Sequence, residues 1–133
     1  MAGAQTVQQV YELFGKGDIP GILAKLAPDV EWEYGEASTD VPWLQPRRGR
    51  EAVAGFFQSL LAIEFHSFVP RTILESGRTV VALVDLDATV KATGARVVEL
   101  DEVHIWHFGD DGLVRRFRHR ADTHLQWQAY HGR

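Results

Sequence analysis

The sequence of 133 residues contains no cysteine and no long hydrophobic run. Without cysteine, disulfide scaffolds, cysteine-ligated zinc sites and thiol catalysis are excluded. No apolar run approaches the roughly 18 residues of a membrane-spanning helix. Glu12, Lys16 and Asp18 also fall where a signal peptide needs an apolar core. We therefore expect a soluble, cytoplasmic protein that makes no membrane contact.

Acidic residues outnumber basic residues in the sequence. The chain has 14 lysines and arginines against 18 aspartates and glutamates, a formal net charge of −4. Nucleic-acid binding needs a basic footprint for the phosphates, so no nucleic-acid partner is expected. The chain also lacks a phosphate-binding glycine loop, a nucleophile elbow and a dinucleotide-binding fingerprint. With 45% hydrophobic and 24% charged residues, we expect residues 1–133 to form one folded domain.

Helical patterns occupy the first part of the chain. In residues 7–14 apolar side chains recur at spacings of three and four, which predicts an amphipathic helix. A second, shorter helix is expected after Asp18, which can cap it, with Pro20 in its first turn. A third is expected from about Arg50. Its apolar stripe consists of Val53, Phe56, Phe57, Leu60 and Leu61.

Strand patterns dominate the remainder, after a loop expected over residues 35–49. The expected strands cover residues 30–34, 68–74, 79–90, 96–108 and 113–121, followed by a short tail. Helices followed by a run of strands indicate the α+β class. We predict three N-terminal helices packed on one face of a strongly curved, mainly antiparallel sheet.

The last two strands should form a hairpin, because Asp111-Gly112 favours a tight two-residue turn. Such a turn makes the numbers of paired residues sum to 223. A three-residue loop would break this pattern. The expected pairs on one face are His104 with His119, Trp106 with Phe117 and Glu102 with Ala121.

The opposite face of this hairpin has a different chemistry. It should hold Val114, Arg116, Arg118 and Arg120 on the last strand, and Val103, Ile105 and His107 on its neighbour. We interpret the first face as the lining of a concave cavity and the second as a surface that packs partly against a second subunit. The three arginines indicate a solvated or interface stripe, with an anion clamp as the alternative.

The candidate site lies on the cavity face, where His104 and His119 meet aromatic side chains. An apolar pocket with a few convergent polar groups is typical of a small-molecule site, and histidine can exchange protons near neutral pH. The alternatives are two hydrogen-bonded core histidines and, less favoured, a metal site with Glu102 as third ligand. The residues expected to hold a substrate are Trp32, Tyr34, Trp43, Phe57, Trp106 and Phe117.

Asp122 follows the last strand and should lie at the rim of the cavity. Desolvation beside aromatic side chains would raise the pKa of its carboxyl group and suit it to acid or base catalysis. Equally, Asp122 could cap a C-terminal turn or short helix. The sequence leaves both interpretations open.

Three segments carry a family resemblance: LAPDVEWEY, PRRGREAVAGFF and DEVHIWHFGDDGLVRRFRHRADT. In this order they resemble the SnoaL-like branch of the NTF2-like superfamily, which includes polyketide cyclases, ketosteroid isomerases and limonene epoxide hydrolase. The resemblance covers nearly the whole chain. It implies a single cone-shaped domain, in which three helices wrap a curved sheet, and a homodimer through the convex face of that sheet.

The resemblance does not imply steroid isomerisation. The positions of the three catalytic groups of ketosteroid isomerases correspond here to Trp32, Val10 and His104, and Tyr11 is one residue out of register. A one-residue offset turns a helical side chain by about 100°. The epoxide hydrolases also need an arginine that the corresponding strand lacks. Polyketide cyclases resemble the chain best, because their terminal acid/base aspartate corresponds to Asp122.

We therefore expect a cofactor-independent acid/base enzyme of the isomerase or cyclase type, acting on a hydrophobic carbonyl compound. In this hypothesis His104 is the electrophile or the proton shuttle, Asp122 is the base, and His119 orients or tunes these groups. No metal is required. The alternative is a non-catalytic ligand-binding or dimerisation module of the same superfamily, since a fold does not by itself establish function.

Overall fold

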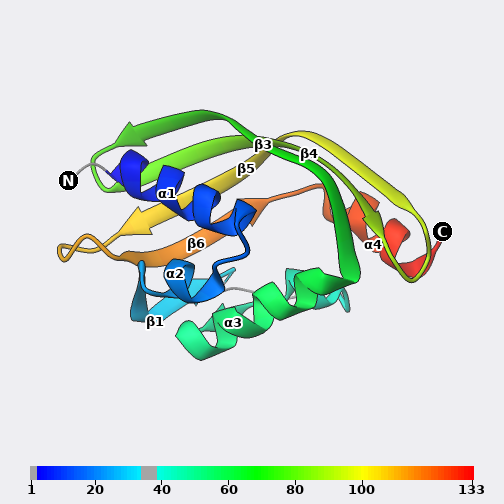
Figure 1. Cartoon of the computed structure of the whole chain (residues 1–133), viewed down its shortest axis with the longest axis horizontal. Coiled ribbons are helices and arrows are strands. Elements are labelled where there is room, and N and C mark those ends of the chain that lie inside the picture. Colours follow the sequence, from blue (N-terminus) through cyan, green and yellow to red (C-terminus); the bar gives the residue numbers. More distant parts are fainter. Residues whose placement is uncertain (1–2, 34–38) are drawn as a thin grey trace.

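The computed structural model describes residues 3–33 and 39–133 (Figure 1). The helices are α1 (Gly3–Gly15), α2 (Ile19–Leu23), η1 (Pro42–Leu44), α3 (Arg50–Ser59), η2 (Leu60–Ala62) and α4 (Thr123–His131). The strands are β1 (Leu26–Trp32), β2 (Arg47–Arg48), β3 (Ile63–Ser76), β4 (Thr79–Val90), β5 (Arg96–Phe108) and β6 (Val114–Arg120). No helix within these ranges is both long and apolar enough to cross a membrane.

The strands form one sheet in the order β2-β1-β6-β5-β4-β3. Only the β1–β6 pair among them is parallel. Figure 1 shows the long strands β3, β4 and β5 bending around α1, with α3 below and α4 at the far end of the curve. This arrangement confirms the predicted α+β fold with helices on one face of a curved sheet. The tail after β6 is helical, so that α4 is a fourth α-helix beyond the three that were predicted.

The start of α2 follows the sequence prediction. Asp18 Oδ1 accepts a hydrogen bond from the Gly21 N–H at 2.9 Å, and Pro20 lies in the first turn. Both features satisfy the helix end, since the first N–H groups have no partner within the helix. β1 begins earlier than expected and ends at Trp32, because Glu33 leaves the strand with a φ of 51°.

The β5–β6 hairpin has the predicted register but a different turn. His104 pairs with His119 and Trp106 with Phe117, as expected. The two-residue turn is wrong: the Gly109 N–H bonds to the Leu113 carbonyl at 3.0 Å, which gives a longer connection. A bulge between His107 and Phe108 compensates for the extra length.

This bulge and the end of β6 correct two further expectations. Val114 pairs with Phe108 and is fully buried, so it does not belong to the outer face. The pairing of Glu102 with Ala121 is also wrong, because β6 ends at Arg120 and Glu102 pairs with Val84 of β4.

A second bulge interrupts β5 between Glu99 and Glu102. Glu99 pairs with Leu86, and Glu102 pairs with Val84. Between these two pairs β5 therefore contains one more residue than β4. Asp101 takes up the difference with a φ of 58°, and its N–H donates to Asp85 Oδ1 at 3.0 Å. Strict alternation would place two residues three positions apart on opposite faces. The bulge therefore turns both glutamates inward.

We expect Asp101→Val to lower the free energy of unfolding by about 1–2 kcal/mol, because a β-branched residue is disfavoured at positive φ. Asp101→Gly should not lower it by this amount, since glycine adopts this conformation freely. Urea unfolding of both variants checks the difference, with Glu64→Val as the control at an exposed strand position without a positive φ. Equal losses in both Asp101 variants would contradict the proposed strain.

Candidate functional site

A cavity of about 100 Å³ lies between the helices and the concave side of the sheet. Its wall is mostly aromatic and aliphatic. The polar side chains in the wall are those of Tyr11, Glu102, His104, His119 and Gln126. Trp32, Trp43, Phe57, Trp106 and Phe117, all expected to hold a substrate, also line it. Tyr34 lies outside the described residues.

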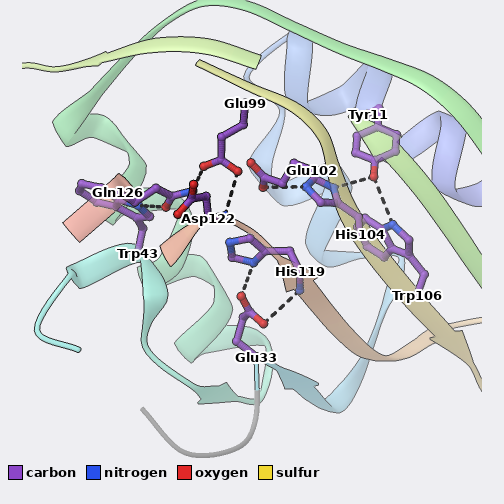
Figure 2. A network of polar contacts seen from close by, with 10 residues as sticks. All are labelled: Tyr11, Glu33, Trp43, Glu99, Glu102, His104, Trp106, His119, Asp122 and Gln126. Atoms are coloured by element: carbon purple, nitrogen blue, oxygen red, sulfur yellow. Dashed lines mark hydrogen bonds and ion pairs between the residues drawn. The ribbon is translucent and has the colours of Figure 1, made fainter. Parts of the chain in front are cut away.

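One hydrogen-bond chain crosses the cavity wall from α1 to β5 (Figure 2). Trp106 Nε1 donates to the Tyr11 hydroxyl at 3.3 Å, and this hydroxyl lies 2.7 Å from His104 Nδ1. His104 Nε2 lies 3.1 Å from Glu102 Oε1. The chain therefore joins an indole, a phenol, an imidazole and a carboxyl group.

The donors in this chain determine the histidine tautomer. The Trp106 indole can only donate, so the Tyr11 oxygen accepts and its own proton points to His104 Nδ1. Burial raises the pKa of Tyr11, which keeps that proton on the phenol. Burial also lowers the pKa of His104, against the opposing effect of Glu102. His104 is therefore neutral, with its proton on Nε2 and directed to Glu102.

Tyr11 corrects an expectation from the sequence. Tyr11 lies one residue out of register, and its side chain was therefore expected to point away from the site. Its ring instead contacts those of Phe68, His104 and Trp106. The apolar face of a core-facing helix is more than 100° wide, so Val10 and Tyr11 can share one cavity. The apolar spacing of residues 7–14 contained this signal.

A second polar pair joins β6 to the end of β1. His119 Nδ1 forms an ion pair with Glu33 Oε2, and Glu33 Oε1 accepts the His119 backbone N–H at 3.0 Å. Burial opposes the charge on His119, but the hydrogen bond and negative charge of Glu33 outweigh it and raise the pKa. His119 therefore favours the imidazolium form.

Sequence analysis missed Glu33. Alternation along β1 places Val30 and Trp32 inward and would place Glu31 and Glu33 outward. The φ of 51° at Glu33 breaks the alternation and brings its carboxylate to His119. A hydrophobic pattern in the sequence does not predict a positive φ at a glutamate.

Asp122 lies at the N-terminus of α4 rather than in the cavity wall. Its side chain is exposed, and Oδ1 accepts the Leu125 N–H at 3.0 Å. This is the capping role, one of the two interpretations that the sequence left open. The Asp122 backbone N–H reaches the interior instead, where it donates to Glu99 Oε2 at 3.1 Å.

Glu99 is a further buried carboxyl group that was not predicted from the sequence. Strict alternation puts Glu99 and Glu102 on opposite faces of β5, and only the bulge at Asp101 puts them on the same face. Glu99 Oε1 accepts Gln126 Nε2 at 2.6 Å, and Gln126 Oε1 accepts Trp43 Nε1 at 2.8 Å. Burial raises the pKa of Glu99. Thus Gln126 of α4 holds this carboxyl group directly, and Trp43 of η1 holds Gln126 in turn.

Glu102 has the opposite tendency. Burial alone would raise its pKa, but the bond from His104 and the charge of His119 together lower it. Its Oε2 is buried and has no hydrogen-bond donor among the described residues. The Trp32 Nε1–H is also buried and has no acceptor among them. Within residues 3–33 and 39–133 no group of three acidic or histidine side chains could hold a metal ion.

Comparison with known proteins extends over most of the chain. The model of the SnoaL-like domain family matches residues 7–117. An NTF2-like protein of unknown function from Burkholderia pseudomallei K96243 is 28% identical with a TM-score of 0.82, and 98% of each chain is covered. An NTF2-like protein from Burkholderia xenovorans LB400 is 25% identical with a TM-score of 0.83, covering 96% of this chain and 95% of that one.

A third structure, TerC co-crystallized with polyporic acid, shares the fold. It is 24% identical with a TM-score of 0.79, and the match covers 97% of this chain and 98% of TerC. No curated protein matches the sequence.

We expect Glu33→Gln to lower the pKa of His119, because the replacement removes the charge that stabilises the imidazolium. The wild-type pair contributes stability fully below the ordinary histidine pKa of about 6.5, and this contribution is lost as pH rises through the folded-state value. The free energy of unfolding of Glu33→Gln should not show this decrease as the pH rises. NMR titration of the His119 ring and urea unfolding against pH measure both effects.

Glu31→Gln serves as the control, since Glu31 faces Arg116 at 3.7 Å and not His119. An unchanged His119 titration in Glu33→Gln would show that Glu33 does not set its charge.

Proposed function

The chain belongs to the SnoaL-like domain family, and we propose on this basis that it moves a proton on an uncharged, hydrophobic carbonyl compound without a cofactor. The reaction is of the isomerase or cyclase type. The single observation that supports it is that Glu102 and His119 lie in the wall of one apolar cavity, where their surroundings lower the pKa of the first and raise the pKa of the second.

The geometry of adjacent strands supports two complementary roles. The rings of His104 and His119 are cross-strand neighbours with centroids 5.9 Å apart, and His104 bonds to Glu102. A base and a hydrogen-bond donor for developing negative charge therefore face one space. In apolar surroundings such groups act strongly, because little water screens them.

Charge indicates the class of ligand. No lysine or arginine is among the described residues that line the cavity. His119 and Glu33 neutralise each other, which leaves Glu102 as a negative charge. A carboxylate or phosphate on the ligand would meet repulsion and a desolvation cost. The cavity therefore favours a neutral molecule.

The proposed steps conserve protons. Glu102 takes a proton from the carbon next to the carbonyl group, while the His119 imidazolium donates a hydrogen bond to the forming enolate oxygen. In isomerisation the protonated Glu102 returns that proton to another carbon of the ligand. In ring closure the enolate carbon attacks a second carbonyl carbon, and Glu102 protonates the resulting alkoxide.

His104 and Tyr11 have a supporting role in this proposal. Neutral His104 donates to Glu102 Oε1 and so orients the carboxylate, and Tyr11 fixes the tautomer of His104. This differs from the roles expected for His104 and Asp122 on sequence alone. The base moves from Asp122 to Glu102, since the Asp122 carboxylate is exposed and caps α4.

The co-crystal of TerC with polyporic acid supports only the broader point that this fold can be found with an organic small molecule. For this chain, a thermal-shift screen of aromatic polyketides, terpenoids and steroids can identify ligands. Proton abstraction is then detected by NMR as exchange of ligand C–H for deuterium in D₂O.

We expect Glu102→Gln to slow this exchange by about 10²-fold or more while ligand binding persists, because the amide cannot accept the proton. Glu64→Gln, on the exposed face of β3, should leave the rate unchanged. Binding without exchange in the wild type would instead support the alternative, a non-catalytic ligand-binding module.

Asp122→Asn separates the two assignments of the base. Asparagine caps helices about as well as aspartate, so α4 should be retained. The proposed role of Glu102 gives this variant an exchange rate close to that of the wild type. A loss comparable to that of Glu102→Gln would restore Asp122 as the base.

We also propose a homodimer through the convex face of the sheet. Val69, Leu74, Val98 and Leu100 expose 39%, 58%, 52% and 74% of their area, and all lie on β3 or β5. Leu74 pairs with Val81, and Val81 with Ile105, so an apolar row crosses three strands. Contiguous apolar surface of this kind is typical of an interface.

Light scattering of the wild type should therefore give twice the mass of one chain. We expect Leu74→Arg to produce monomers, because a charge would be buried in the interface. Leu61→Arg is the matched control, since Leu61 is 68% exposed but lies in η2, outside this face. A wild-type monomer, or equal effects of both variants, would contradict the convex-face dimer.

A further inference from the structure

Glu99 and Glu102 are neighbouring carboxyl groups in the protein interior, and each acts on the pKa of the other (Figure 2). Their residues are 7% and 6% exposed, and the bulge at Asp101 turns both inward. Each must find hydrogen-bond donors, because a buried carboxylate oxygen without one costs free energy.

The donors around this pair satisfy three of the four oxygens. Glu99 Oε1 and Oε2 accept bonds from Gln126 Nε2 and the Asp122 N–H, and Glu102 Oε1 accepts one from His104 Nε2. Glu102 Oε2 is buried without a donor among the described residues. If both groups were ionised, this oxygen would lack a donor and would lie near the negative charge of Glu99.

We propose that Glu99 is a positioning residue that retains its proton and donates it to Glu102 Oε2, so that the two carboxyl groups hold one proton between them. The carboxylic acid of Glu99 supplies the missing donor, and Glu102 stays ionised in a fixed orientation. The catalytic meaning of this arrangement rests on the proposed function. The shared proton itself does not.

The surrounding charges favour this state. The titratable groups that face the pair are His104 on β5, His119 on β6, Glu33 after β1, Tyr11 on α1 and Asp122 before α4. Among them only His119 is cationic, and Glu33 already neutralises it. Two neighbouring carboxylates with no cation to balance them resist joint ionisation.

The directions of the two pKa values agree with this geometry. Burial raises the pKa of Glu99, whereas His104 and His119 hold that of Glu102 below its ordinary value despite burial. Both directions agree with the proposed position of the proton on Glu99. A continuous chain of donors results, from Trp43 through Gln126 and Glu99 to Glu102, where it meets the chain from Trp106, Tyr11 and His104.

Infrared spectroscopy tests the shared proton without any ligand. At neutral pH the wild type should show the carbonyl band of a buried carboxylic acid, and Glu99→Gln should lose it. Glu64→Gln, at an exposed position, should retain the band. Glu102→Gln gives an independent check, because the amide introduced there can donate to an ionised Glu99, and the band should again disappear. Absence of the band in the wild type, or its persistence in both variants, would overturn the proposal.

Stability against pH gives a second measurement. A glutamate whose pKa is raised in the folded state contributes most below its unfolded value of about 4.3, and this contribution is lost as pH rises through the folded value. The free energy of unfolding of the wild type should therefore decline over this interval relative to that of Glu99→Gln, which cannot ionise. Parallel curves would contradict a proton held on Glu99.

The exchange assay links the shared proton to catalysis. Glu99→Gln retains a donor and should keep both the rate and its pH profile near neutral pH. Glu99→Ala removes the donor and should raise the pH at which Glu102 ionises. The acidic limb of the rate profile should then move up by about one pH unit, which is a tenfold lower rate at a pH on that limb. Equal rates and pH profiles in both variants would contradict the positioning role. Wild-type protein that shows the infrared band but no exchange would refute the proposed function alone.

Discussion

Three glutamates with buried or largely buried carboxyl groups set the main constraint on this structure. A charge enclosed in an apolar interior is strongly destabilising unless hydrogen bonds or an opposite charge compensate it. His119 compensates Glu33, His104 compensates Glu102, and Gln126 with the Asp122 amide holds Glu99. The helices, the sheet and α4 are therefore joined by polar contacts as well as by apolar packing.

Two backbone irregularities make these contacts possible. Among the described residues, Glu33 and Asp101 are the non-glycine residues with positive φ. The first directs its own carboxylate to His119, and the second lets Glu99 and Glu102 share the concave face. Such conformations cost of order 1–3 kcal/mol each and cluster at functional sites. Their position here supports the assignment of the site to this end of the cavity.

The aromatic wall determines how these polar groups act. Trp32 stacks on Phe117 with ring centroids 4.1 Å apart, and both contact Trp106. Interlocked rings of this kind have few alternative rotamers and exclude water, so the polar side chains keep a defined geometry in a medium that screens them weakly. A hydrophobic ligand and a small number of directed hydrogen bonds suit such a space.

The sequence by itself determined the fold class, the capped start of α2, the register of His104 with His119 and the aromatic cavity residues. All of these follow from periodicity or from short-range turn and cap chemistry, which adjacent residues specify. Glu33, Glu99 and Tyr11 joined the site only in the tertiary structure. A positive φ, a bulge and the width of a helix face decided their directions, and these depend on contacts between segments far apart in the chain. The same holds for the capping position of Asp122, which depends on where α4 begins.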